Sequence, residues 1–229
     1  MLAPRIYPTP ELEPDLQLLP FAERPRLLAG PIKRAMDLAI AVFVFLAAAL
    51  PITLLAIVVL VCDRQPPFYA DTRVGLGGRR FRCLKLRTMR SDPAILQAYF
   101  VGHPAEQHRY LVTRKLEWDP RITSVGRILR KTSLDELPQV WNVLRGEMSI
   151  VGPRPLSPSE FEARGPARFT LASARPGLTG LWQVSGRSNL DPASRVVLDN
   201  YYALNWSIWM DLRIIAATPL AVLTARGAK

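Results

Sequence analysis

The uncharged segment of residues 38–62 constrains the fold of this chain more than any other feature. Its 25 residues are enough for a helix to cross a bilayer. Pro51 interrupts it near the centre, where a proline removes a helix hydrogen bond and clashes with the preceding turn. Basic residues flank both ends, with Lys33 and Arg34 before and Arg64 after, and such flanks favour the cytosolic side. We therefore expect a re-entrant helix-break-helix, with a proline-kinked spanning helix as the alternative.

Proline content and charge divide the chain into three parts. Residues 1–31 contain seven prolines and little apolar periodicity, which predicts an extended tail. Residues 32–63 form the expected membrane helix. Residues 64–229 form the expected polar domain, of ordinary size for a single domain.

The polar domain carries the whole positive charge of the protein. The chain has 30 Lys and Arg against 19 Asp and Glu, a net charge of +11, and its first 62 residues are balanced. Such a surface favours anionic lipid headgroups, nucleic acid or phosphorylated substrates. Cys62 and Cys83 cannot form a disulfide framework. His103 and His108 lie outside any Cys or His cluster, so a zinc site is not expected.

Two adjacent carboxylates, Asp135 and Glu136, stand in one of the most arginine-rich parts of the chain. Because guanidinium groups bind phosphates, a carboxylate among them either forms a structural ion pair or acts on a bound phosphate. Ser133 and Glu136 also have the spacing of a capping box, and apolar residues recur at helical spacing from Leu134 to Leu144. This pattern predicts a helix that begins at Ser133. The two carboxylates would point about 100° apart on it, which favours different roles.

Residues 68–89 predict a β-hairpin with a glycine-rich turn. Lys85 and Arg87 alternate with leucines and share one face of its second strand. They are either a pair of cations aimed at a phosphate or charges that protect an exposed edge. Residues 119–123 predict a turn into a short helix that carries Arg130.

Two segments rich in glycine and proline supply further arginines. Residues 149–151 predict a short strand that runs into a Gly-Pro-Arg-Pro loop, where two prolines restrict the backbone around Arg154. Residues 175–187 combine glycines, a tryptophan, Arg175 and Arg187 without Walker or dinucleotide-binding spacing. These patterns indicate a rigid arginine loop and a ligand loop without naming the ligand.

The carboxyl-terminal part carries a second membrane signal. Aromatic and polar residues alternate between Asp199 and Arg213, and aromatic rings with a polar edge suit the headgroup region. Residues 214–225 are uncharged, but they contain Pro219 and are too short to span a bilayer alone. We expect interfacial helices here, with a core-packing helix as the alternative for the last segment.

Together these segments resemble the bacterial sugar transferase family, the monotopic phosphoglycosyl transferases that start lipid-linked glycan assembly. The resemblance covers residues 32–226 and looks like the short form of the family, without the extra amino-terminal membrane helices of longer members. Many members have a serine before the membrane proline, where this chain has Leu50. The resemblance rests on KRAMDLAI at 33–40, KLRTM at 85–89, DPRIT at 119–123, LRKTSLDELPQVWNVLRGEMSIVGPRPL at 129–156, RPGLTGLWQVSGR at 175–187 and NWSIWMDL at 205–212.

The resemblance implies an α+β, mostly helical, monotopic membrane protein. It would have an N-terminal re-entrant helix-break-helix, a small β-hairpin and interfacial amphipathic helices. Residues 64–229 would be a cytosolic catalytic domain on the cytoplasmic face of the bacterial inner membrane. Its activity would transfer hexose-1-phosphate from a UDP-sugar to undecaprenyl or another polyprenyl phosphate, with Mg²⁺, and release UMP. This is the first membrane step of exopolysaccharide or glycan assembly.

The resemblance also assigns roles to residues. Asp135 matches the nucleophile that forms a covalent aspartyl-phosphosugar intermediate, and Glu136 matches the second member of an Asp-Glu dyad. Either could hold Mg²⁺. Lys85, Arg130 and Arg154 match positions linked to phosphate contact or active-site structure. From pattern and resemblance together, the residues expected to bind substrate are Lys85, Arg87, Arg130, Arg154, Arg175, Arg187 and Asp199.

The expected partners are a UDP-sugar, polyprenyl phosphate and anionic membrane lipids, without nucleic acid. Glucose or galactose is the favoured sugar. The oligomeric state stays open, with a homodimer among the options. The alternative functions are a membrane-tethered basic nucleic-acid-binding module and a non-catalytic scaffold. The first would need a groove-entering helix or interleaved aromatic and basic residues, which the sequence does not clearly contain.

Overall fold

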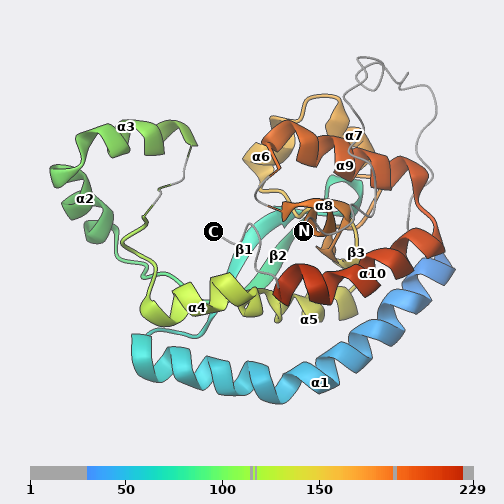
Figure 1. Ribbon diagram of the computed structural model, residues 1–229, viewed down its shortest axis with the longest axis horizontal. Helices are drawn as coiled ribbons and strands as arrows, with labels where there is room; N and C mark the ends of the chain where they lie inside the picture. The colour runs from blue at the N-terminus through green and yellow to red at the C-terminus, as the bar shows by residue number, and fades with distance from the viewer. Residues whose placement is uncertain (1–29, 114–115, 117, 188–189, 224–229) are drawn as a thin grey trace, which may run out of the picture.

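The computed structural model describes residues 30–113, 116, 118–187 and 190–223. The expected tail therefore lies almost entirely outside the described residues. The fold is mostly helical with a small β-hairpin, as predicted, and it has a second small sheet that was not predicted. Figure 1 shows the long helix α1 along the base, the sheets in the centre, and helices α2 and α3 set apart on one side.

Helix α1 (Pro31–Asp63) is the membrane candidate, and it is continuous through Pro51. Among the described residues it is the one helix long and apolar enough to cross a membrane. It curves along the base of the molecule (Figure 1), so the expected interruption is a bend within one helix. Two features favour bending here. Pro51 lacks an N–H, and the Thr53 hydroxyl donates to the Ala49 carbonyl within the same turn.

Both ends of α1 are attached to the polar domain. At its start, Lys33 forms ion pairs with Asp37 at 3.0 Å and with Asp211 at 2.9 Å. Lys33 and Asp37 lie one turn apart on the helix. At its end, Asp63 accepts a hydrogen bond from the Thr123 hydroxyl at 2.8 Å. The helix thus lies across the domain instead of leaving it.

The predicted hairpin is confirmed. Strand β1 (Phe68–Val74) pairs antiparallel with β2 (Arg80–Leu86) through the short 3-10 turn η2 (Leu76–Gly78). The strand predicted at residues 149–151 is also present as β3 (Ser149–Val151), which pairs in parallel with β4 (Gly177–Thr179). A methyl group at Gly177 would lie 2.1 Å from the Gly152 nitrogen, so glycine is needed where these two segments meet.

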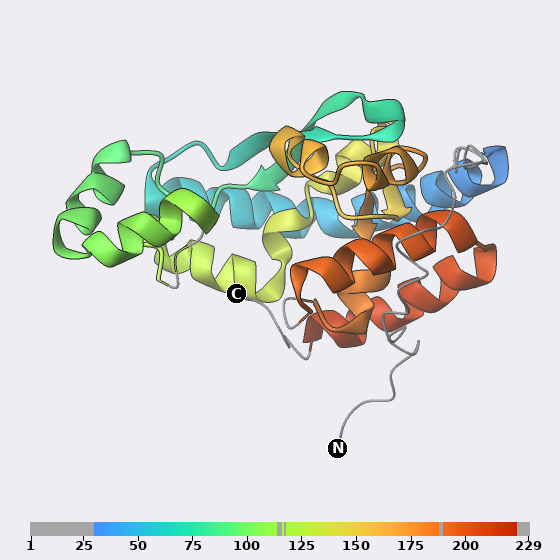
Figure 2. The same ribbon diagram turned by 90° about the horizontal axis from the view of Figure 1, so that it is seen from above.

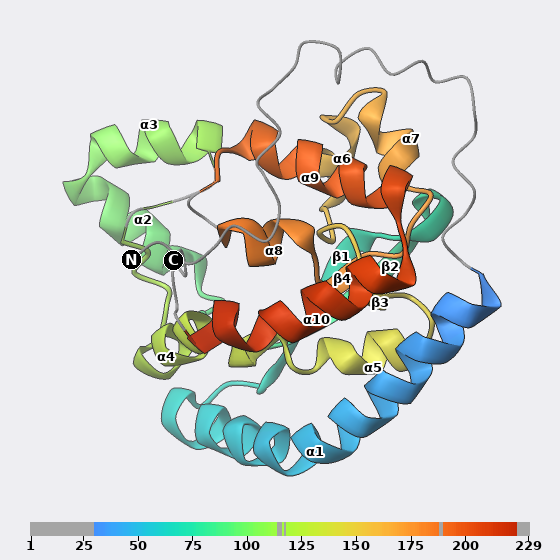
Figure 3. The ribbon, with the colours of Figure 1, turned by 45° about the vertical axis from the view of Figure 1, so that its right-hand side comes forward.

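Short helices cover the sheets. Seen from above, the β1–β2 hairpin lies on one side of α1 and the helices α9 and α10 lie on the other (Figure 2). Turning the molecule shows α10 and α5 running across it above α1 (Figure 3). The helices after β2 are α2 (Pro93–Gly102), α3 (Pro104–Thr113), α4 (Ser124–Thr132), η3 (Leu134–Glu136), α5 (Gln139–Leu144), α6 (Pro158–Glu162), α7 (Ala167–Leu171), α8 (Leu181–Ser185), α9 (Pro192–Asn205) and α10 (Ile208–Leu223).

The core forms where β3 meets the carboxyl-terminal helices. Helix α10 buries Met210 and Ile214 in this core and exposes Trp209 and Leu220 on its other face. The sequence left open whether the final helix lies at the interface or packs on the core. The structure shows that one face packs on the core and that the other face is exposed and mostly apolar, with Arg213 among its residues.

Candidate active site

Asp135 lies on the 3-10 turn η3 between α4 and α5, and its side chain is largely buried. Burial raises the pKa of this carboxyl to about 6, and the neighbouring Glu136 carboxylate adds to the rise. The Lys85 and Arg130 charges oppose that rise. Asp135 is therefore a poorly solvated carboxylate that is ionised near neutral pH and faces two cations from other elements.

Glu136 is directed differently from its neighbour. Lys85, on β2, donates to Glu136 Oε1 at 2.6 Å. Burial lowers the pKa of Lys85, but the charge and hydrogen bond of Glu136 outweigh that effect, so this pKa is raised. Lys85 thus remains a cation that acts on both carboxylates and is bonded to one of them. The different roles expected for Asp135 and Glu136 stay a prediction.

The predicted capping box is wrong. Ser133 has a left-handed backbone (φ +57°) that ends α4, its side chain makes no cap, and α5 begins only at Gln139. Tertiary contact explains the difference, because the Glu136 carboxylate that would complete the box is bound to Lys85. Pro138, just before α5, also has no N–H to contribute to a regular helix. The carboxylates therefore lie on a short 3-10 turn, and no α-helix begins at Ser133.

Arg130 is held close to Asp135 by two neutral groups. Its Nε donates to Thr88 Oγ1 at 2.9 Å, and its Nη2 donates to Met89 Sδ at 3.0 Å. These two residues were not picked out from the sequence. They belong to the KLRTM string, but only the fold shows that they contact Arg130.

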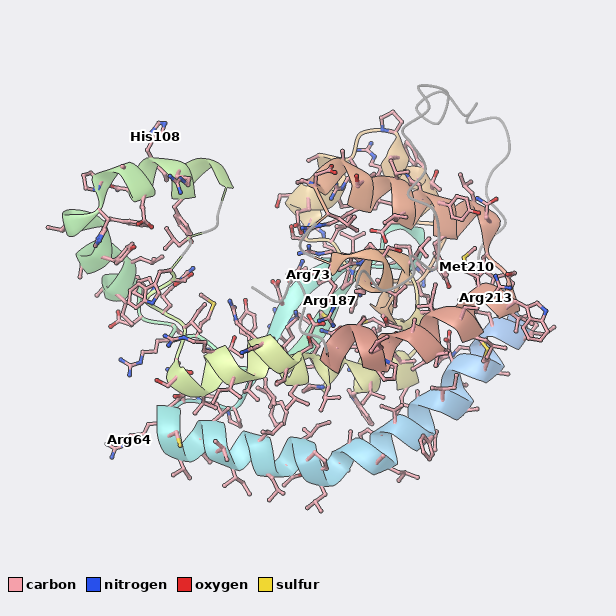
Figure 4. All side chains as sticks on the ribbon, viewed as in Figure 1. Arg64, Arg73, His108, Arg187, Met210 and Arg213 are labelled. Atoms are coloured by element: carbon pink, nitrogen blue, oxygen red, sulfur yellow. The ribbon has the colours of Figure 1, made fainter. Side chains whose placement is uncertain are left out.

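Arg187 is a third cation near the carboxylates, because its charge interacts with that of Glu136. It follows α8, and Figure 4 shows it in the middle of the molecule, whereas His108 stands on the separate α2–α3 lobe. Burial lowers the pKa of Arg187, and the Glu136 carboxylate opposes that effect. Its backbone is left-handed (φ +54°), as is that of Ser133. Such strain in non-glycine residues often accompanies functional sites.

Two predicted arginines are not placed with the carboxylates. Strand β2 ends at Leu86, and the Arg87 side chain bonds to the Pro66 carbonyl at 2.8 Å and to Ser91 Oγ at 2.6 Å. Arg175 Nε donates to the Gly146 carbonyl at 2.8 Å. Arg87 also lies over the Tyr69 ring, 5.6 Å from its centre, and Tyr69 is the cross-strand partner of Lys85, so the two cations share one face of the hairpin as predicted. That they act together on one phosphate stays a prediction.

Arg154 and Asp199 form a second group beside α8. The Arg154 guanidinium lies over the Trp182 ring, 5.7 Å from its centre, and Arg195 lies 5.5 Å from the same ring. Burial raises the pKa of Asp199 to about 7, although the Arg154 backbone N–H and the nearby Arg154 and Arg164 charges oppose it.

Several buried polar atoms in this second group have no hydrogen-bond partner among the residues that the structure describes. Asp199 Oδ1, Trp182 Nε1 and Gln183 Oε1 are all of this kind. Buried polar atoms normally have a hydrogen-bond partner. The region is thus suited to receive a polar ligand, and α8 connects it to Arg187 and the carboxylates.

The carboxylates fit magnesium in one specific way. The described residues contain no group of three or more His, Cys, Asp or Glu side chains arranged to hold a metal. Mg²⁺, however, is often bound by one or two carboxylates together with substrate phosphates. Asp135 and Glu136 are neighbours in the chain, and one or both of their carboxylates would suit that arrangement.

The sequence matches a known family and several characterised proteins. Residues 28–225 match the family described as bacterial sugar transferase. The chain is 46% identical to the exopolysaccharide production protein ExoY of Sinorhizobium fredii, over 88% of this chain and 90% of that protein. It is 39% identical to the UDP-glucose:undecaprenyl-phosphate glucose-1-phosphate transferase of Caulobacter vibrioides, over 95% of this chain and 80% of that protein. It is 40% identical to the undecaprenyl-phosphate galactose phosphotransferase of Salmonella typhimurium, over 86% of this chain but 41% of that protein.

Proposed function

Because this chain belongs to the bacterial sugar transferase family, we propose that it moves hexose-1-phosphate from a UDP-sugar to undecaprenyl phosphate and releases UMP. Family and relatives make it a phosphoglycosyl transferase of exopolysaccharide production. The observation that carries the mechanism is the buried Asp135 carboxylate beside Lys85 and Arg130. A desolvated carboxylate next to cations is a suitable nucleophile for an anionic phosphate.

The reaction has two displacements at the same phosphorus. An Asp135 oxygen attacks the sugar-bearing phosphorus, a new O–P bond forms, and the bond to the UMP oxygen breaks. An oxygen of undecaprenyl phosphate then attacks that phosphorus, and the Asp135 carboxylate leaves. The products are undecaprenyl diphosphate-sugar and UMP. Covalent catalysis of this kind divides one difficult transfer into two easier steps.

The main obstacle is repulsion between anions. Three cations from different parts of the chain act on the carboxylates: Lys85 on both, Arg130 on Asp135 and Arg187 on Glu136. Their charges would stabilise the phosphate oxygens as the transfer proceeds. Lys85 stays protonated through its bond to Glu136, so the site keeps its cation even though Lys85 is partly desolvated.

Magnesium would be held by the oxygens of Asp135 and Glu136 together with those of the substrate. When bound, it supplies Lewis-acid neutralisation of the diphosphate. The donor's nucleoside end would extend along α8 toward Arg154 and Asp199, where the unpartnered polar atoms lie. Arg87 and Arg175 are placed to support the surrounding loops.

The membrane arrangement is part of the proposal. Both ends of α1 are bonded to one domain, at Lys33 and at Asp63, so both lie on the same side of a bilayer that receives the helix. This supports a re-entrant helix, with residues 64–229 on the cytoplasmic face of the inner membrane. Such a protein holds its carboxylates near the depth at which a lipid phosphate lies, which is a proximity effect. The basic surface and the exposed Trp209 face of α10 would rest on anionic lipids.

Glucose or galactose is the proposed sugar, since similar proteins are named for each. The test is to measure UMP release from UDP-glucose and UDP-galactose, with and without undecaprenyl phosphate. Donor alone should leave a phosphosugar adduct on the peptide of residues 131–145, and a magnesium chelator should prevent it. Asp135→Asn should abolish both adduct and turnover, while Glu162→Gln, an exposed carboxylate in α6, serves as control. Near-normal turnover by Asp135→Asn would show that the nucleophile is misassigned.

A further inference from the structure

A continuous series of hydrogen bonds runs from the carboxyl end of α1 to Arg130. The Thr123 hydroxyl donates to Asp63, the last residue of α1, at 2.8 Å. The Thr123 backbone N–H donates to the Thr88 carbonyl at 3.1 Å. Thr88 Oγ1 accepts from Arg130 Nε at 2.9 Å. Both threonines are buried, so the series is largely protected from competing water.

Helix α4, which carries Arg130, is packed directly against Thr88. A methyl group at Gly126 would lie 2.1 Å from the Thr88 carbonyl oxygen, so the helix backbone touches that residue. Thr123 also caps α4, because its hydroxyl accepts from the Gly126 N–H at 2.9 Å. Arg130 is one turn further along the same helix. Its position therefore depends on where residues 88 and 123 are held.

The contacts of Arg130 orient it without compensating its charge. A hydroxyl and a thioether are neutral, unlike the Asp119 carboxylate that pairs with the nearby Arg121 at 2.6 Å. The Arg130 charge acts on Asp135, together with Lys85 from β2, and also on Asp119, which is itself paired with Arg121. Because the hydrogen-bond partners of the guanidinium are neutral, they orient it without forming an ion pair with it.

We propose that Thr88 and Asp63 are positioning residues, which hold the Arg130 charge beside Asp135 from the end of the membrane helix. Thr88 acts directly through its hydroxyl, and Asp63 acts through Thr123. The geometry of the carboxylate site is thereby linked to the position of α1 against the polar domain. This inference rests on the proposed transferase function.

The first test replaces the Thr88 hydroxyl. In single turnovers with UDP-sugar and no lipid, Thr88→Val should slow adduct formation about tenfold, the effect expected for one lost hydrogen bond to a charged group. Its KM for the UDP-sugar and its thermal unfolding midpoint should stay close to those of the wild type. Thr88→Ser retains the hydroxyl and should restore the rate. Thr53→Val, on the exposed part of α1, is the matched control and should react normally.

The second test addresses the link to α1. Asp63→Ala removes the acceptor for Thr123 and should slow adduct formation, whereas Asp63→Asn keeps an acceptor oxygen and should not. In the double variant with Thr88→Val, the rate should fall by less than the product of the two single effects, because both act through Arg130. Asp63→Ala changes no group at the carboxylates, so it serves independently if Thr88→Val folds poorly.

The outcomes separate the inference from the function on which it rests. If the wild type forms no adduct and releases no UMP, the transferase mechanism fails. If the wild type reacts and Thr88→Val or Asp63→Ala matches it, only the positioning roles are wrong. Equal losses in Thr88→Ser and Thr88→Val would likewise overturn the role of the hydroxyl.

Discussion

The charge state of individual residues follows from burial as much as from neighbours. Asp135 and Asp199 are both buried carboxyls near arginines, and in both the loss of solvation dominates and raises the pKa. Glu160, with the Ser157 N–H, Arg154 and Arg73 around it, behaves oppositely. Burial raises its pKa, but those hydrogen bonds and charges together outweigh burial and lower it. The direction of the pKa shift of a carboxylate among arginines can therefore be given only when the solvation of that carboxylate is known.

Asp199 should make stability depend on pH. In the folded chain its pKa is about 7, whereas an unfolded aspartate titrates near pH 4. Between these values the folded state binds a proton that the unfolded state has released, so the free energy of unfolding falls as pH rises, by on the order of 1 kcal/mol per pH unit. Asp199→Asn removes this titration. It should match the wild type near pH 4 and be more stable at pH 8, as measured by unfolding midpoints.

The same substitution separates stability from binding. If Asp199 receives the donor, Asp199→Asn should raise the KM for the UDP-sugar although it stabilises the fold. Asp191→Asn, at the exposed start of α9, is the control. If the wild type is more stable at pH 8 than at pH 5, and Asp199→Asn shows the same pH dependence, the raised pKa assigned to Asp199 is contradicted.

At the scale of elements, α1 packs through its small residues. Ala41, Ala48 and Ala56 face the domain and are buried, whereas Phe43 and Leu46 are more than 70% exposed. In a water-soluble protein the large apolar residues would turn inward. This arrangement is what a helix needs when one face meets protein and the other meets lipid.

Lys33 should be essential for holding the start of α1 against the polar domain. It is 3% exposed, and it pairs with Asp37 and Asp211, which are fully buried. Lys33→Met leaves two carboxylates without their cation, which should cost about 3–5 kcal/mol. Unfolding midpoints would measure this loss. Lys131→Met, at an exposed position of α4, should change stability little, and a similarly small effect for Lys33→Met would show that the network is dispensable.

Gly126 should tolerate no side chain. Its added methyl group would overlap the backbone carbonyl of Thr88, which cannot turn aside as a flexible side chain would. We expect Gly126→Ala to destabilise the fold by about 1–3 kcal/mol, the usual cost of overpacking. Gly102→Ala meets nothing within 4 Å and should be neutral or slightly stabilising. The thermal unfolding midpoints of the two variants are measured in parallel. Equal midpoints would contradict the close contact between Gly126 and the Thr88 carbonyl.

At the scale of the whole molecule, the two attachments of α1 predict its topology. In a background with Cys62→Ser, Ile32→Cys reports on the start of the helix, and native Cys62 reports on its end. Both positions are exposed, and Cys83 is buried. An impermeant maleimide should label both in inverted membrane vesicles and neither in right-side-out cells, because the proposed re-entrant topology puts both ends on the cytosolic side. Labelling of the two positions from opposite sides would establish a spanning helix.

The parts of the structure foreseen from the sequence are those that depend on local chemistry. The hairpin at residues 68–89 has its own turn, the helix carrying Arg130 has its own apolar stripe, and both were predicted. The capping box at Ser133 failed because its Glu136 bonds to Lys85, about fifty residues earlier in the chain. Lys85 and Arg87 share a face of the hairpin as predicted, but their hydrogen-bond partners are different, and only the fold shows this.

The amino-acid sequence by itself determined the apolar membrane helix, the arginine-rich chemistry around Asp135, and the family. Each follows from residues that are neighbours in the chain, or from strings that need no fold to be read. Only the tertiary structure decided which cations reach the carboxylates, that Thr88 and Met89 hold Arg130, and that both ends of α1 attach to one domain. Solvation and long-range contacts decide these properties, and both exist only once distant segments have packed together.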